Sequence, residues 1–302
     1  MTILFLGACG QSALLEESDE KESLNVVTTF YPVFEFASQV VGDYANVTVI
    51  LEAGQDSHHY EPSPKDLAAI YDADVFIYSS EYMETWVPAV LDNLLESDVK
   101  IIEASQGIPF YEEDSNEEEE DHDHEGHSHI VDPHIWLDPV YASQMVETIS
   151  EEMQVVDEEH SKMYEENAGI YQSELKELDR QFQEAFEGAA SRTFVVQHAA
   201  FGYLARRYDL NQVSVSSLTS EQEISPAKLA EIGTFINENQ IQTIYYQDSA
   251  SAKVAETLAK ETDTNLEVLY TIEGVTLEEQ DEGIDYLHLM QSNIEALKTT
   301  IK

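Results

Sequence analysis

The 302-residue sequence predicts an α/β protein of two lobes, each a parallel β-sheet flanked by helices, joined by one long rigid helix. Three observations predict this class. Short β-branched runs alternate with helical segments from Leu24 onward, the alternation resumes late in the chain, and one long amphipathic segment lies between. We therefore expect an N-terminal lobe at 24–140, connecting helices at 141–191 and a C-terminal lobe at 192–302.

Local signals define the elements of the N-terminal lobe. A helix is expected at Pro32–Val41, with proline near its start and Gly42 just past its end. Ser63 is the expected N-cap of a second helix that has Pro64 at its first position. The expected strands are Leu24–Thr28, Asn46–Leu51, Asp74–Tyr78 and Val99–Ile102.

An apolar stripe with steps of three or four residues runs through 158–188 and predicts one amphipathic helix, with Asp157 as its N-cap. About 30 residues at ~1.5 Å each span roughly 45 Å, enough to reach across two lobes. The alternative is that the stripe forms a coiled-coil dimer. The stripe consists of Tyr164, Ala168, Tyr171, Leu175, Leu178, Phe182 and Ala185.

In the C-terminal lobe, Ser225 and Ser249 are expected to open two helices, and residues 278–299 are expected to form the last helix. The expected strands are Thr193–Gln197, Gln212–Val215, Thr243–Tyr246 and Leu266–Tyr270.

The charge is strongly acidic, with 14 Lys and Arg against 61 Asp and Glu, a net charge of −47. Nucleic acid and anionic lipid headgroups are therefore not expected partners, because binding them relies on basic residues that neutralise phosphate. A solvated acidic coat explains most of this charge, and such a surface favours cations.

The single cysteine, Cys9, follows an apolar run that ends in Leu6-Gly7-Ala8, which resembles the end of a bacterial lipoprotein signal. The resemblance implies lipidation of Cys9, with 1–23 as signal remnant and tether and the protein anchored on the extracellular face of the cell membrane. A frayed apolar N-terminus is the alternative. No later segment reaches the ~18 apolar residues of a membrane span.

Candidate ligands follow the predicted strands, where ligands of open parallel sheets bind. Three imidazoles and one carboxylate fall at such positions, two in each lobe, and this donor set suits Zn²⁺. A lone histidine at a strand end is more often structural, but several at one predicted cleft favour a metal site. The stretches after these strands contain His58-His59, His134, His198 and Glu273.

The low-complexity segment 112–129, expected to be disordered, has ten acidic residues and four histidines. Flexible imidazoles and carboxylates can collect zinc weakly, whereas the alternative is a solvated charge run without a specific role. The histidines are His122, His124, His127 and His129.

Six stretches resemble the zinc-binding solute-binding lipoproteins of bacterial ABC importers, the ZnuA/AdcA type of the metal-binding cluster A-I family. They occur in family order from Leu24 almost to the C-terminus, and an acidic His-rich insertion before the fourth is typical of the zinc members. The stretches are VVTTFYPVFEFASQVVGD, SHHYEPSPKDL, METWVP, DPHIWLDP, QHAAFGYLARRY and ETLAKETDTNLEVLYTIEGVT.

The resemblance implies that His58, His134 and His198 are the first three zinc ligands and Glu273 the fourth, although some members use water or another carboxylate there. His59 occupies a variable motif position. Manganese-binding relatives place a carboxylate where this chain has His198, so zinc is the expected metal. Asp209 stands where glycine is usual, and aspartate tolerates left-handed geometry.

The resemblance also implies a function: extracellular high-affinity capture of zinc and its delivery to an ABC permease and ATPase, by a monomer that is not an enzyme. A zinc hydrolase with Glu273 as base is one alternative, although H-E-x-x-H, G-x-S-x-G and P-loop motifs are absent from the sequence. A surface adhesin or structural lipoprotein is the other.

Overall fold

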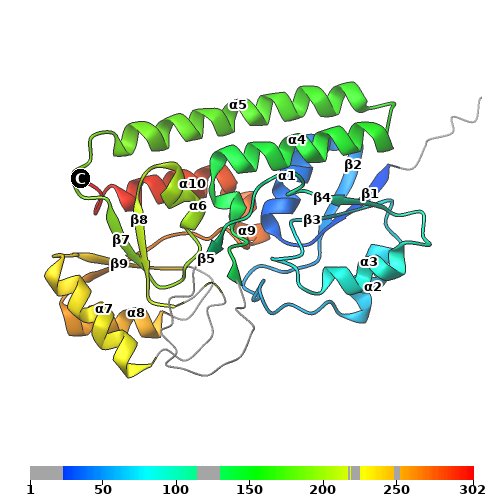
Figure 1. Ribbon diagram of the computed structural model, residues 1–302. Coiled ribbons are helices and arrows are strands. Elements are labelled where there is room, and N and C mark those ends of the chain that lie inside the picture. The colour runs from blue at the N-terminus through cyan, green and yellow to red at the C-terminus, as the bar shows by residue number, and fades with distance from the viewer. Residues whose placement is uncertain (1–22, 114–129, 217, 219–224, 248–251) are drawn as a thin grey trace, which may run out of the picture.

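The computed structural model describes residues 23–113, 130–216, 218, 225–247 and 252–302. Two four-stranded parallel sheets dominate it (Figure 1), as the predicted fold class requires. The first sheet has the order β2-β1-β3-β4, and the second has the order β10-β9-β7-β8. Their strands are β1 (Leu24–Thr28), β2 (Ala45–Val49), β3 (Val75–Tyr78), β4 (Lys100–Glu103), β7 (Thr193–Val196), β8 (Asn211–Ser214), β9 (Thr243–Tyr246) and β10 (Asn265–Val268).

Helices α1 and α2 begin at the predicted signals, and α1 also ends at its predicted glycine. Helix α1 (Tyr31–Val41) is followed by Gly42 at φ +54°, a conformation that favours glycine. The turn η1 (Gly42–Tyr44) leads into β2. Helix α2 (Pro64–Tyr71) has a reciprocal capping box between Ser63 and Asp66. Helix α3 (Val87–Leu94) completes the lobe.

Two helices, α4 (Pro139–Val156) and α5 (Ser161–Phe186), lie side by side along one face of both lobes (Figure 1). The prediction that Asp157 caps the long helix is wrong, because Asp157 ends α4 and α5 begins at Ser161. The Asp157 carboxylate instead accepts hydrogen bonds from the Tyr164 hydroxyl at 3.0 Å and from the His160 ring at 2.7 Å.

The apolar stripe of α5 packs inside its own chain, against α1, α4 and α10 (Tyr286–Leu297). Six of its seven predicted members are buried, Ala185 is partly buried, and Phe186 adds to the stripe. The stripe belongs to one continuous core that includes Val26 of the first sheet and Phe194 of the second. One core thus holds the two lobes in a fixed position relative to each other. The apolar stripe is buried within this chain and is not available for a coiled-coil dimer.

The C-terminal lobe contains α6 (Gly202–Arg207), α7 (Pro226–Glu238) and α8 (Lys253–Thr262). Ser225 caps α7 as predicted, whereas Ser249 lies outside the described residues and α8 begins at Lys253. The single last helix predicted at 278–299 is wrong. Gly283 at φ +82° separates α9 (Leu277–Asp281) from α10, whose first turn Asp285 caps.

None of the described helices combines the length and apolarity needed to cross a bilayer.

Helix α5 offers a matched test of the shared core. Leu178→Ala should lower the free energy of unfolding by about 2–5 kcal/mol, because Leu178 is almost completely buried and its loss leaves a cavity. Ile170→Ala, at an exposed position of the same helix, should change it by about 0.5 kcal/mol or less. Denaturant unfolding measures both, and equal losses would contradict the assigned packing of α5.

Candidate metal centre

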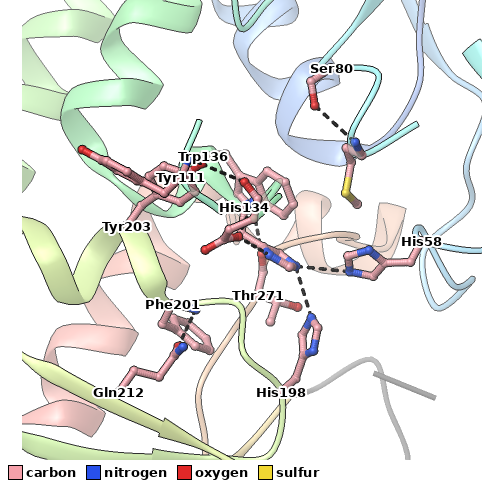
Figure 2. A network of polar contacts seen from close by, with 12 residues as sticks. His58, Ser80, Tyr111, His134, Trp136, His198, Phe201, Tyr203, Gln212 and Thr271 are labelled. Carbon is pink, nitrogen blue, oxygen red and sulfur yellow. Dashed lines mark hydrogen bonds and ion pairs between the residues drawn. The ribbon is translucent and has the colours of Figure 1, made fainter. Parts of the chain in front are cut away.

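Three imidazole rings converge between the two lobes (Figure 2). Nε2 of His134 lies 3.2 Å from Nε2 of His58 and 3.1 Å from Nε2 of His198. One donor atom from each of these residues and one from Glu273 all lie within 4.8 Å of one another. Within the part of the chain that the structure describes, no other cluster of His, Cys, Asp and Glu is this suited to a metal.

The spacing of these nitrogens fits tetrahedral zinc. Zn–N bonds of ~2.0–2.1 Å place two ligand nitrogens about 3.3–3.4 Å apart along a tetrahedron edge. The observed separations of 3.1 and 3.2 Å are close to that value. His134 Nε2 is therefore already near tetrahedral spacing from the other two imidazoles, and all four donors lie within 4.8 Å of one another.

The donors come from segments that follow strand ends, as the sequence predicts. His58 lies in the connection after β2, His198 is two residues after β7, and Glu273 lies between β10 and α9. His134 is set between β6 (Ile130–Val131) and the turn η2 (Ile135–Leu137). Strand β6 pairs with β5 (Glu112–Glu113), which fixes the chain just before His134.

Asp132 orients the His134 ring. Its Oδ1 lies 2.8 Å from Nδ1 of His134 and also accepts the backbone N–H of His134 at 3.0 Å. A proton on Nδ1, donated to this carboxylate, leaves the lone pair of Nε2 directed at the site. Burial, together with repulsion from His58, lowers the pKa of His134 to about 3, so the ring is neutral and able to bind metal.

Helix α6 of the C-terminal lobe holds Asp132 in place. The Tyr203 hydroxyl donates to the backbone carbonyl of Asp132 at 2.7 Å. A Cβ atom at Gly202 would lie 2.6 Å from the Asp132 carboxylate, so any larger residue there would displace that carboxylate. Sequence reasoning missed Asp132 and Gly202, although Asp132 stands two residues before His134 and could have been recognised as an orienting carboxylate.

Glu273 brings an ionised carboxylate into the protein interior. Burial alone would raise its pKa, but electrostatic interactions with the three imidazole rings and the Ser57 hydrogen bond lower it. Ser57 Oγ donates to Oε2 at 2.6 Å. Oε1 is buried, and no described residue donates a hydrogen bond to it. An ionised buried oxygen beside three imidazoles has the chemistry of a metal ligand.

His59, next to His58 in the sequence, is not part of this cluster. His59, set aside as a ligand, is turned toward Asp56, with Nδ1 2.7 Å from the Asp56 carboxylate and half of its side chain exposed. Cys9 and the histidines of the acidic segment, His122, His124, His127 and His129, lie outside the described residues.

Two α/β lobes on one core, with donors from both lobes meeting between them, define a two-lobed metal-binding protein. The chain belongs to the ZnuA family, described as the periplasmic zinc-uptake complex component A, whose model matches residues 26–300.

The chain is 43% identical to the high-affinity zinc uptake system protein ZnuA of Bacillus subtilis strain 168, over 99% of this chain and 94% of that protein. It is 44% identical to the zinc-binding lipoprotein AdcA of Streptococcus pneumoniae strain R6, over 98% of this chain but only 58% of AdcA. The crystal structure of the Zn(II)-bound ZnuA-like domain of Streptococcus pneumoniae AdcA matches with a TM-score of 0.79 and 40% identity, covering 92% of this chain and 99% of that domain.

The orientation of His134 by Asp132 leads to a prediction. Asp132→Ala should weaken metal binding about 10–100-fold, because the ring loses the partner that fixes its tautomer. Zinc titration with a competing chelator measures the change, and circular dichroism checks the fold. Asp98→Ala, at an exposed position away from the site, is the control. Unchanged affinity in Asp132→Ala would show that His134 needs no such partner.

Proposed function

We propose that this protein captures Zn²⁺ with His58, His134, His198 and Glu273 and delivers it to an ABC permease and ATPase for zinc uptake. One observation supports this most directly. Three imidazoles, which bind metal in their neutral form, and one ionised, buried carboxylate converge at spacings suited to tetrahedral zinc. Membership of the ZnuA family, and relatives named for zinc uptake and zinc binding, support the same function.

The donor set supports zinc over harder cations. Magnesium, calcium and manganese prefer oxygen ligands, whereas three of these four donors are imidazole nitrogens. A transported ion must also leave the site. A single carboxylate among neutral ligands offsets part of the charge of Zn²⁺ and binds it less firmly than a set of thiolates would.

We propose binding without catalysis. A catalytic zinc keeps one coordination position open for water and needs a base close by. Here the only carboxylate among the four clustered donors is Glu273, and one of its oxygens lies within 4.8 Å of the imidazole donor atoms. Glu273 as the fourth ligand uses the position that a reactive water would need.

We also propose that Cys9 carries a lipid that anchors the protein on the extracellular face of the cell membrane, where it acts as a monomer. The lipoprotein-like run before Cys9 and the name of the AdcA relative support the anchor. The packing of the α5 stripe within its own chain supports the monomer.

The ligand assignment predicts unequal effects of neighbouring histidines. His58→Ala, His134→Ala and His198→Ala should each weaken zinc binding by more than the ~10–100-fold typical of outer-shell partners, because each removes a direct ligand. His59→Ala should leave affinity nearly unchanged, since its ring faces Asp56. Isothermal titration with a chelator competitor measures the affinities.

The same variants test the function in cells. Cells that depend on this protein should fail to grow under zinc limitation with any of the three ligand variants, but not with His59→Ala. Normal growth with the ligand variants would argue for the adhesin alternative.

The acidic segment is proposed to collect zinc weakly for the tight site. Replacing His122, His124, His127 and His129 together by alanine should therefore leave one tight zinc per molecule and remove only weaker, additional zinc. Metal analysis after equilibrium dialysis at low and high free zinc separates the two classes. Loss of the tight zinc would instead place a ligand within this segment.

A further inference from the structure

Ile272 adopts a backbone conformation that its side chain disfavours, with φ +59°. Three other non-glycine residues of the described chain have positive φ: Asp209, Gln240 and Asp263. Each of these closes the end of a helix, α6, α7 or α8, where a left-handed residue is common. Ile272 follows no helix and is the only β-branched residue of the four, so it is the strained one.

The chain on both sides of Ile272 is held firmly. The buried Asn293 of α10 accepts the N–H of Tyr270 and donates to its carbonyl, both at 2.8 Å. The Trp136 indole donates to the Thr271 carbonyl at 2.8 Å (Figure 2). A strained backbone persists where its surroundings fix it in this way.

The downstream side is equally constrained. A Cβ atom on Gly274 would lie 3.0 Å from the Cα of Ala53, so the two loops pack backbone to backbone across the lobes. The Ile272 side chain itself is completely buried in the shared core. The left-handed turn is thus trapped between two anchored segments, and Glu273 is the residue that leaves it.

We infer that Ile272 is the positioning residue of the fourth ligand: its left-handed turn directs Glu273 into the site, and its strain makes Glu273 the ligand that withdraws first when zinc is released. This inference rests on the proposed zinc-binding function. The physical reason is that withdrawal of Glu273 by a backbone rotation at Ile272 returns Ile272 to an allowed region. An L-residue is disfavoured in the left-handed region by a factor of roughly 5–30 relative to glycine, and this factor favours release.

Two substitutions at one position separate strain from side-chain loss. Ile272→Gly and Ile272→Ala both remove the buried side chain, but only glycine accepts positive φ without strain. Zinc release into excess chelator, followed by stopped flow, should be roughly 5–30-fold slower for Ile272→Gly than for Ile272→Ala. The zinc-free protein should unfold at a higher denaturant concentration for Ile272→Gly than for Ile272→Ala.

The exposed Ile170 of α5 supplies the matched control. In an ordinary helix alanine is the better residue, so Ile170→Ala should be more stable than Ile170→Gly, the reverse of the order at Ile272. Neither change at Ile170 should alter zinc release. The same stability order at both positions would overturn the claim that Ile272 is strained.

The route through Glu273 is tested by repeating the pair of Ile272 variants in a Glu273→Ala background. The difference in zinc release should vanish there, while the difference in zinc-free stability should remain. A difference in release that persists without Glu273 would overturn the positioning role. A wild-type protein without a tight zinc site would overturn the proposed function itself, whereas a tight site with equal release rates for the two Ile272 variants would overturn this inference alone.

Discussion

The spacing between imidazole nitrogens of different lobes is the constraint on which this structure depends. His134 and His198 come from separate sheets, yet their Nε2 atoms lie 3.1 Å apart. A relative lobe movement of even 1 Å would change metal coordination at these bond lengths. The continuous core beneath α5 and α10 restricts that movement, because packed side chains resist small continuous displacements.

The segment 132–139 concentrates the contacts that fix the lobes. Asp132 orients His134. Asp138 caps α4 and also forms an ion pair with Arg207 of α6, with Asp138 Oδ2 2.8 Å from Arg207 Nη2. The Tyr286 hydroxyl of α10 donates to the carbonyl of Trp136 at 2.6 Å. A short stretch of sequence thus supplies a proposed metal ligand, its orienting partner and four polar contacts to the C-terminal lobe. Binding and lobe placement are therefore coupled through the same backbone.

Sequence reasoning succeeded where the determining interactions are local. Ser63 and Gly42 act as the predicted helix signals, and Asp209 adopts the left-handed geometry that aspartate tolerates. Strand order along the chain, together with the family resemblance that separates His58 from His59, predicted the donors that the structure brings into one cluster. It failed at the ends of two helices. Asp157 closes α4 because it bonds to groups of the next helix, and Gly283 interrupts a pattern whose apolar residues alone favour one helix.

The backbone strain at Ile272 is the clearest case of information that no local pattern carries. Isoleucine has no preference for positive φ, so the turn exists only because Asn293, Trp136 and Ala53 hold its two sides. Asp132 combines a local and a distant signal. Its spacing from His134 can be read from the sequence, but its fixed position depends on Gly202 and Tyr203 of the other lobe.

The short antiparallel pair β5 and β6 isolates the stretch between these strands from the metal site. Glu112 pairs with Val131, so the two ends of the intervening stretch are joined by backbone hydrogen bonds before the chain reaches His134. Changing the length of a closed loop costs little, about 0.6 kcal/mol for each doubling. Evolution can therefore lengthen, shorten or recompose what lies between these strands without shifting the site. For the same reason the position suits the insertion of a fluorescent domain as a label that leaves the site in place.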